Sequence, residues 1–317
     1  MKVDAILVSY NTRGLLMDAL HSLREHGGTL LNGVIVVDNA SNDGTPEAVR
    51  GAFPDVTFVE AGGNIGFGAA NNLGLARSAA ERVLFMNPDA RLTEGALQYL
   101  VDCIDSGSHV AVAGPALKYP DGSFQPSCRR FPSVLRNFWC FSGLEAQLGT
   151  WMPGLSNWLS EEAHSTARAV DMVSGACFLA ARACVDAAGG FDENLFMYEE
   201  EADLMLPTRR AGCEVRYCPA AVVFHVGGAS TENAGRSPFQ QRHLFRSKYY
   251  LFRKHYGRLR ARLAYLSDLA VFSVSRLLAR LRGTNSRAPA SPAVCRRAWR
   301  ESFLTIAELR RQNRLFQ

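Results

Sequence analysis

Val83-Leu84-Phe85-Met86-Asn87-Pro88-Asp89 is an apolar run that leads directly into an acidic turn. A continuous apolar run bounded by a turn signal predicts a strand buried on both faces, as in a parallel sheet. Pro88 has no backbone N–H to donate, so the strand is expected to end there. Asp89 would then stand at the carboxyl edge of the sheet, where open α/β sheets bind ligands and a carboxylate can hold Mg²⁺ or Mn²⁺ against a diphosphate. A turn Asp that caps the next helix fits the same residues equally well.

Three further buried-type strands precede this stretch, and helical patterns separate them. The strands are expected at 5–8, 34–37 and 56–59. The helices are expected at 12–25, after a polar turn at 38–45, and in a stretch that the run 62–72 opens and that ends near 80. Strand and helix alternate four times, which predicts an α/β fold with a doubly wound, mostly parallel sheet. The first strand runs into Ser-Tyr-Asn without G-x-G-x-x-G, and no G-x-x-x-x-G-K-[ST] loop occurs, so the dinucleotide-binding and P-loop classes are excluded.

Polar side chains follow each of these strands at its carboxyl end. Ser9 and Tyr10 follow the first, Asp38 the second and Asn64 the third. The glycines at 62, 63, 66 and 68 would let the backbone approach a phosphate or a sugar, and a plain tight turn explains them as well.

A second group of polar residues lies beyond residue 170. A strand-like run over 172–180 and a short helix over 183–188 lead to Glu199-Glu200-Glu201-Ala202-Asp203. Acidic residues at a helix start suit its dipole, but the apolar run 195–197 beside them predicts partial burial, which raises a carboxylate pKa and permits base chemistry. His225 ends another strand, where it is either a structural histidine or a ligand.

Composition narrows the class of protein. The 317 residues carry a net charge of +5, and only four of the 35 basic residues are lysine. Many of the arginines lie beyond residue 240, which predicts a basic C-terminal surface facing phosphates or anionic lipid. The eight cysteines form no C-x-x-C pair, so neither a zinc site nor a disulfide scaffold is expected, and reduced thiols suggest a cytosolic protein. The chain enters a strand at once, with no secretory h-region, and no run of 18 apolar residues predicts a membrane span.

Seven motifs, in this order, resemble glycosyltransferase family 2, the inverting enzymes of GT-A fold, and most closely its bacterial rhamnosyltransferase-like branch. They are V-S-Y-N (8–11), V-V-D-N-A-S-N-D-G-T (36–45), G-N-I-G-F-G-A-A-N-N (63–72), F-M-N-P-D (85–89), V-S-G-A-C-F-L-A-R in outline (173–182), G-F-D-E-N-L-F-M-Y-E-E-E-A-D-L (190–204) and H-V-G-G-A-S-T (225–231). The resemblance covers about three quarters of the chain and implies a nucleotide-binding N-terminal half.

The resemblance also implies a role for individual residues. Asp38 would receive the base or ribose of a nucleotide-diphosphate sugar, and the loop after the third strand would line its pocket. Asn87 and Asp89 occupy the family's D-x-D position, with Asp89 as a ligand of Mg²⁺ or Mn²⁺ and His225 completing the metal shell. The residues expected to bind substrate are Ser9, Tyr10, Asp38, Asn64, Gly66, Phe67, Asn72, Asn87, Gly175 and Asp203.

The catalytic base is expected at Glu201, with Glu200 as the rival. Placed on the family pattern, the two glutamates match its acid pair, and Glu201 replaces an aspartate. In a helix that starts here, Glu200 and Asp203 share a face, while Glu201 points about 100° away. We therefore expect Glu201 to face the acceptor hydroxyl.

The function implied is transfer of a sugar, with L-rhamnose from dTDP-rhamnose favoured, to a hydroxyl of a cell-surface polysaccharide or lipid-linked glycan precursor. Asn87 and Glu201 each stand where the family pattern has an aspartate. These two departures keep an alternative open, in which the protein is a catalytically silent nucleotide-sugar-binding or scaffolding subunit of a glycan assembly complex. A sugar-1-phosphate nucleotidyltransferase is disfavoured, because the Gly-rich loop after the first strand is missing.

The division expected is a catalytic domain over 1–240 and a basic helical extension over 241–317. Within the extension, apolar residues recur at helical spacing between arginines over 258–282, which is typical of an interfacial helix on an anionic membrane. A helix packed on the catalytic domain, with a solvated basic face, is the competing interpretation. A linker is expected over 283–292 and a last helix over 293–316. No recognition motif supports a nucleic-acid partner, and the expected location is the cytoplasmic face of a bacterial cell membrane.

Overall fold

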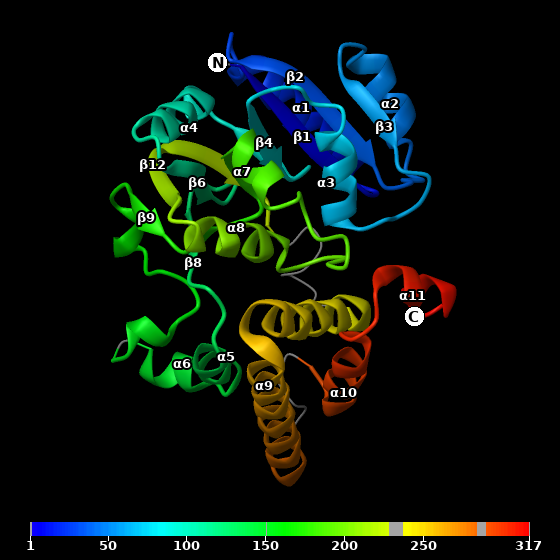
Figure 1. Cartoon of the computed structure of the whole chain (residues 1–317), viewed down its shortest axis with the longest axis vertical. Coiled ribbons are helices and arrows are strands. Elements are labelled where there is room, and N and C mark those ends of the chain that lie inside the picture. Colours follow the sequence, from blue (N-terminus) through cyan, green and yellow to red (C-terminus); the bar gives the residue numbers. More distant parts are fainter. Residues whose placement is uncertain (1, 150, 228–236, 284–289, 317) are drawn as a thin grey trace. The chain divides into compact units, whose positions relative to one another are not determined.

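The computed structural model describes residues 2–149, 151–227, 237–283 and 290–316 (Figure 1). The chain divides into two compact units. The sheet unit comprises Met1–Arg129, Trp158–Glu193 and Glu200–Ala229. The helical unit comprises Arg130–Asn157, Asn194–Glu199 and Ser230–Gln317.

The sheet unit is built on one large mixed sheet with the strand order β3-β2-β1-β4-β11-β6-β12-β5. Its strands are β1 (Val3–Ser9), β2 (Leu31–Asp38), β3 (Thr57–Glu60), β4 (Arg82–Met86), β5 (Ala90–Leu92), β6 (Val110–Lys118), β11 (Cys177–Ala181) and β12 (Glu214–His225). Two short strands extend it, β7 (Phe124–Gln125) beside β6 and β9 (Arg168–Val170) beside β12, and β8 (Cys128–Arg129) pairs separately with β10 (Met172–Val173).

The N-terminal half of the sheet is parallel, as the alternation of strands and helices predicts. β1 pairs in parallel with both β2 and β4, so the carboxyl ends of all three meet at one edge. β11 then enters antiparallel to both β4 and β6, which makes the whole sheet mixed. The predicted α/β class is confirmed, and the antiparallel strands are added to its second half.

Helices cover both faces of this sheet. α1 (Arg13–His26) and α4 (Ala96–Asp105) contribute to a core with Leu7 and Leu84. α3 (Phe67–Leu75) lies against the opposite face, where an added Cβ on Gly74 would lie 2.6 Å from Ile6 Cγ2. The remaining α-helices of the unit are α2 (Thr45–Ala52), α7 (Arg182–Ala187) and α8 (Glu200–Arg210).

Three elements differ from the sequence prediction. The last helix expected over 293–316 is two helices, α10 (Pro292–Glu301) and α11 (Ile306–Arg311). α3 ends at Leu75, before the expected end near residue 80, because the Ser78 hydroxyl accepts from Ala80 N and donates to the buried Asp4 carboxylate. The single strand expected over 172–180 is two strands, since the Ser174 hydroxyl accepts from Ala176 N and turns the chain between β10 and β11.

The helical unit contains α5 (Val134–Phe141), α6 (Leu144–Leu148), α9 (Pro238–Leu281), α10 (Pro292–Glu301) and α11 (Ile306–Arg311). α9 bends at Gly257, whose φ of 86° and ψ of 166° lie outside helical space. The bend gives a proximal segment (238–256) and a distal segment (258–281). Phe245, Tyr249 and Phe272 from the two segments pack with Cys295 of α10 in one apolar cluster.

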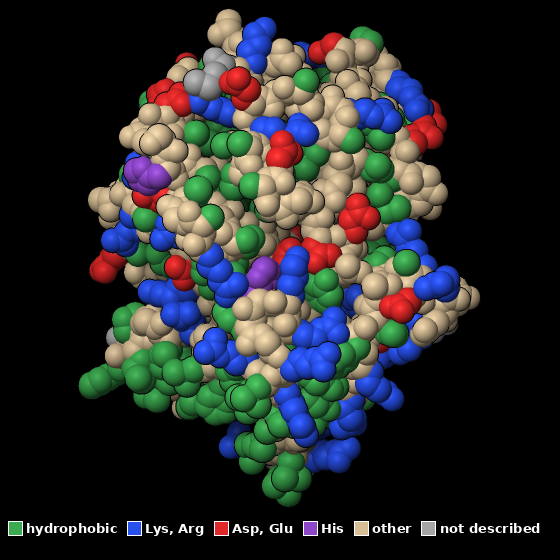
Figure 2. Space-filling model, in the orientation of Figure 1, with side chains coloured by type: hydrophobic (Ala, Val, Ile, Leu, Met, Phe, Trp, Pro, Cys, Tyr) green, Lys and Arg blue, Asp and Glu red, His purple; other side chains and the backbone are tan. Residues whose placement is uncertain are grey.

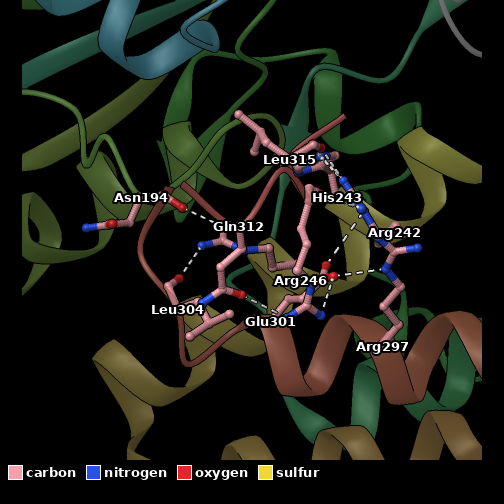
Figure 3. Close-up of polar contacts among 10 residues, drawn as sticks. Asn194, Arg242, His243, Arg246, Arg297, Glu301, Leu304, Gln312 and Leu315 are labelled. Carbon is pink, nitrogen blue, oxygen red and sulfur yellow. Dashed lines mark hydrogen bonds and ion pairs between the residues drawn. The ribbon is translucent and has the colours of Figure 1, made fainter. Parts of the chain in front are cut away.

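A buried polar cluster holds the last turns of the chain onto the proximal segment (Figure 3). Arg246 donates to Asn194 O at 2.6 Å and to Leu304 O at 2.7 Å. Glu301 is fully buried, and Arg297 Nε and Arg314 Nη2 lie 2.9 and 3.0 Å from its Oε1. A buried carboxylate is tolerated here because several guanidinium groups surround it.

The predicted boundary near residue 240 stays a prediction, since the compact helical unit also takes in 130–157 and 194–199. Over the described residues, no helix combines the length and the apolar character that crossing a bilayer requires. Residues 228–231 of the last motif and 284–289 of the expected linker lie outside the described part of the chain.

Candidate active site

The carboxyl ends of β1 and β2 bring Ser9 and Asp38 side by side. The two residues are paired in register, and Asn39 N donates to Ser9 O at 2.8 Å. Asp38 Oδ2 accepts from Ser41 N at 2.8 Å, while its buried Oδ1 has no hydrogen-bond partner among the described residues. A buried carboxylate oxygen normally has a donor, so Asp38 Oδ1 is available to a hydroxyl or N–H of a ligand. Tyr10 beside it is exposed.

The Asn64 loop is held against the end of β2 by Asn39, which the sequence analysis did not select. Asn39 Nδ2 donates to Gly66 O at 3.2 Å, and its Oδ1 accepts from Ile65 N at 3.4 Å. Gly66 has φ 94° and ψ 171°, a backbone conformation that residues other than glycine rarely adopt. The loop and the start of α3, at Phe67, therefore lie close to the end of β2 that carries Asp38.

Asn72, farther along α3, has a structural partner. Its Nδ2 donates to Phe191 O and its Oδ1 accepts from Phe191 N, each at 2.9 Å. The amide thus fixes the chain after Gly190, where an added Cβ would lie 2.7 Å from Asn72 Oδ1. The predicted contact of Asn72 with substrate stays a prediction.

Asp89 and His225 come together where β12 ends beside β5. His225 Nε2 lies 3.3 Å from Asp89 Oδ1, and each side chain keeps a small exposed fraction, 14% and 12%. His225 Nδ1 donates to Gln125 Oε1 at 3.0 Å. Because an amide oxygen only accepts, Nδ1 carries a proton and Nε2 is the ring nitrogen that faces the Asp89 carboxylate.

This pair fits a divalent cation as two protein ligands. A carboxylate oxygen and a neutral imidazole nitrogen are both accepted by Mn²⁺, and the Gln125 contact is the second hydrogen bond that metal-ligating histidines usually make. No group of three or more His, Cys, Asp and Glu that could hold a metal occurs within the described residues. The remaining positions would then belong to diphosphate oxygens and water.

The turn between β10 and β11 links the end of β4 to α8. Asn87 N donates to Ala176 O at 2.8 Å. The neighbouring Gly175 lies against Glu201, since a Cβ built on it would be 3.7 Å from Glu201 Cδ. Asn87, Gly175 and Glu201 are therefore near neighbours in space, although they lie far apart in the sequence.

The acidic residues at the start of α8 divide into two environments. Tyr198 and Glu199 have φ of 70° and 69°, so the chain turns sharply just before the helix. Glu200 and Asp203 are buried, and the Glu201 side chain is 17% exposed. Arg129 Nη1 donates to Glu201 Oε1 at 3.5 Å.

Three residues of this site escaped the sequence analysis. Asn39 lies inside a motif that was quoted for Asp38, so its position in V-V-D-N was a usable signal. Gln125 and Arg129 come from β7 and β8, strands of two residues each, which are too short to show a periodicity. The Arg129 guanidinium also lies over the Trp158 ring, 5.2 Å from its centroid.

Comparison with known proteins agrees with this geometry. A family model described as Glycosyl transferase family 2 matches residues 4–162. The chain is 33% identical over 246 residues to an N-acetylglucosaminyl-diphospho-decaprenol L-rhamnosyltransferase of Mycobacterium tuberculosis, a match that covers 73% of this chain and 78% of the relative. It is also 24% identical to a low-salt glycan biosynthesis hexosyltransferase of Haloferax volcanii, over 60% of this chain and 58% of that protein.

Solved structures share the fold at low sequence identity. A mannosyltransferase from Pyrobaculum calidifontis in complex with GDP-Man and Mn²⁺ superposes with a TM-score of 0.60 at 19% identity, covering 96% of this chain and 87% of that one. A GalNAc transferase with UDP, GalNAc and Mn²⁺ has a TM-score of 0.57 at 13% identity, covering all of this chain and 58% of that one. The expected GT-A fold is confirmed.

Proposed function

The chain belongs to glycosyl transferase family 2, and from that premise we propose that it moves L-rhamnose from dTDP-rhamnose to a hydroxyl of a lipid-linked glycan precursor or a cell-surface polysaccharide. The observation that carries the choice is the 33% identity to a relative whose name specifies L-rhamnose transfer to N-acetylglucosaminyl-diphospho-decaprenol. The contacts of the site residues support the transfer chemistry, and the identity of donor and acceptor rests on the relative.

In this proposal the nucleotide binds at the ends of β1 and β2. Asp38 accepts a hydrogen bond from the ribose or base through its available Oδ1. Tyr10 offers an exposed ring beside it, and the loop from Asn64 to Phe67 covers the sugar. Ser9 is fully buried and bonds Thr12 through its hydroxyl at 3.0 Å, so it shapes the edge rather than reaching far into the site.

The diphosphate lies at the end of β4. Asp89 and His225 would hold Mg²⁺ or Mn²⁺ there, and a bound cation would neutralise the charge that develops on the leaving diphosphate. Gln125 keeps His225 in the tautomer that presents Nε2. Asn87 has no charge, so Asp89 is the carboxylate that this strand end contributes.

Glu201 is the general base. It takes the proton of the acceptor hydroxyl as the acceptor oxygen bonds to the anomeric carbon and the bond from that carbon to the diphosphate oxygen breaks. Attack on the face opposite the leaving group inverts the configuration. Gly175 leaves room beside the carboxylate, and Arg129 orients it. Base assistance of this kind contributes about 10²–10⁴-fold to rate.

A lipid-linked acceptor requires the enzyme to work at a membrane surface. We place the protein peripherally on the cytoplasmic face of the cell membrane, attached through its arginine-rich C-terminal region.

The test is direct transfer by the purified full chain. dTDP-rhamnose, UDP-glucose and GDP-mannose would each be offered with Mn²⁺ and a short polyprenyl-diphospho-N-acetylglucosamine acceptor, and products read by mass spectrometry. We expect one deoxyhexose to be added from dTDP-rhamnose only. Transfer from another donor replaces the substrate assignment, and release of nucleotide from none of them favours a silent binding subunit.

A further inference from the structure

The distal segment of α9 has two opposite apolar faces, and only one of them packs inside the helical unit. Ala261, Ala264, Asp268, Phe272 and Ala279 are buried. At about 100° per residue, these positions lie within one narrow stripe. A second stripe, about 180° away, consists of exposed residues; its members are Leu259, Leu263, Leu266, Ala270, Val274, Leu277 and Leu281. Within the helical unit, the alanines and Phe272 therefore make the packing contacts of this segment, and the leucine stripe does not.

α5 lies beside this segment and continues the exposed apolar surface. Val134 of α5 packs against Ala261 and Ala264, and the Phe141 ring lies 5.8 Å from the Phe272 ring. The other side of α5, the end of α6 and two residues beyond it expose large apolar side chains, which are Leu135, Phe138, Leu148, Trp151 and Met152. Trp151 is 84% exposed. Figure 2 shows hydrophobic side chains gathered over α5, α6 and the distal segment of α9.

Arginines border the leucine stripe on both sides. On the same helical projection, Arg262, Arg276 and Arg280 fall on one flank, while Arg260 and Arg282 fall on the other. All are exposed. Asp268 is the one acidic residue of the distal segment, and it is buried against Lys248 and Tyr249. The exposed charge of this segment is therefore wholly positive.

This pattern identifies what covers the surface. An apolar stripe between two rows of arginine suits a bilayer with anionic headgroups, into which the leucines insert while the guanidinium groups stay at the phosphates. A second copy of the chain would bring rows of like charge together, which disfavours it. An exposed tryptophan is typical of the membrane interface.

We propose that α5, the side chains of Leu148, Trp151 and Met152, and the distal segment of α9 form one membrane-inserting surface that recognises anionic phospholipid. The inference deepens the proposed membrane-bound function, and its test requires no sugar transfer, so failure of one is distinguishable from failure of the other. It adds a second insertion element, distant in the sequence from the C-terminal helix.

The first experiment is sedimentation of the full chain with phosphatidylcholine vesicles, with and without about one-third phosphatidylglycerol. Two double variants, L277Q/L281Q and L135Q/F138Q, should each weaken binding to anionic vesicles at least about tenfold. R276Q/R280Q should weaken it about fivefold per arginine and lower its salt dependence. Tyr99→Gln, at an exposed residue of α4 in the sheet unit, is the matched control and should bind as wild type does.

The second experiment places Trp151 in the bilayer. Vesicles with brominated acyl chains should quench tryptophan emission in the wild type, and Trp151→Phe should lose most of that quenching while it still sediments. Equal quenching in the wild type and in Trp151→Phe would show that Trp151 does not insert into the bilayer. If L135Q/F138Q binds vesicles as tightly as the wild type does, α5 is not part of the membrane-inserting surface and the proposal fails. It also fails if the wild type binds neutral vesicles as tightly as anionic ones. Self-association without lipid that the leucine variants abolish would assign the surface to a second copy instead.

Discussion

Glu201 and Glu200 differ in what surrounds them, although they are neighbours in sequence. Glu200 is buried with Asp203, whereas Glu201 is more open, lies beside Gly175 and accepts from Arg129. A base must reach the acceptor hydroxyl, which favours the more open carboxylate. We expect Glu201→Gln to lower kcat at least about 10²-fold with little change in donor affinity.

The comparison that decides this is Glu200→Gln at the same donor saturation, with circular dichroism to confirm folding. Glu201→Asp should be milder than Glu201→Gln, because it restores a carboxylate with a shorter reach. If Glu200→Gln is the inactive variant and Glu201→Gln works near the wild-type rate, the base is assigned one residue too late.

The proposed metal ligands, Asp89 and His225, give a prediction that can be tested by ligand binding alone, without measuring sugar transfer. Mn²⁺ with dTDP should raise the melting temperature of the wild type, since a ligand that binds only the folded state stabilises it by mass action. Asp89→Asn should abolish the Mn²⁺-dependent part of that shift. Gln125→Leu removes the acceptor of His225 Nδ1 and should weaken Mn²⁺ binding about tenfold or more.

Gln98→Leu serves as the control, because Gln98 bonds only within α4, to Asp102. A full Mn²⁺ shift in Asp89→Asn would remove Asp89 from the metal site. A Gln125→Leu variant with unchanged Mn²⁺ affinity would mean that His225 keeps its orientation without the amide.

Among individual site residues, the sequence predicts the positions of those that lie at the end of a predicted strand. Asp38, Asp89 and His225 each terminate an apolar run, so the edge of the sheet could be inferred from the pattern alone. Gln125 and Arg129 could not, because β7 and β8 are each two residues long, and β8 forms only by pairing with the distant strand β10.

At the scale of the element, Gly257 determines the course of α9. Its φ of 86° and ψ of 166° are essentially restricted to glycine, and a side chain there is strained even though nothing lies within 4 Å of an added Cβ. We expect Gly257→Ala to destabilise the protein by about 1–3 kcal/mol, measured by chemical denaturation. The leucine spacing predicts the helix, but a glycine within a helical pattern does not reveal a bend.

Gly51→Ala is the matched control for that variant. Gly51 lies inside α2 with helical geometry and open space around its Cα, so alanine should be neutral or stabilise by about 0.5–1 kcal/mol. Equal stability of Gly257→Ala and wild type would show that the bend is not enforced by the glycine backbone.

For the whole molecule, composition and alternation predict the α/β class and the parallel N-terminal half. The mixed second half was out of reach, since β11 comes between β4 and β6 in the sheet although 58 residues separate it from β6 and more from β4 in the chain. The helical unit likewise assembles three separate stretches of chain. Such pairings depend on contacts between distant residues, which local periodicity does not encode.

The stability of the whole protein should depend on pH through His243. Burial and the neighbouring Arg242 and Arg246 lower the pKa of this histidine from 6.5 to about 3 in the folded state. Its Nε2 lies 3.1 Å from Leu315 O and 3.0 Å from Arg242 Nη2, and Nδ1 is buried without a partner among the described residues. The folded protein therefore holds the ring neutral at a pH where the unfolded chain protonates it.

The sign follows from linkage. Between about pH 6.5 and 3 the unfolded chain binds one more proton than the folded protein. The free energy of unfolding therefore falls as pH falls through this window, and the contribution of His243 is fully present above it. The loss at pH 5 from this group is about 2 kcal/mol. Arg242 and Arg246 stay charged across this window, so they oppose protonation of the ring throughout it.

His243→Gln keeps a donor toward Leu315 O but cannot titrate, and it should flatten the dependence of melting temperature on pH between 6.5 and 5. His26→Gln, at a partly exposed histidine of α1, should retain the wild-type slope. Identical slopes for His243→Gln and wild type in calorimetry would locate the acid sensitivity elsewhere in the chain.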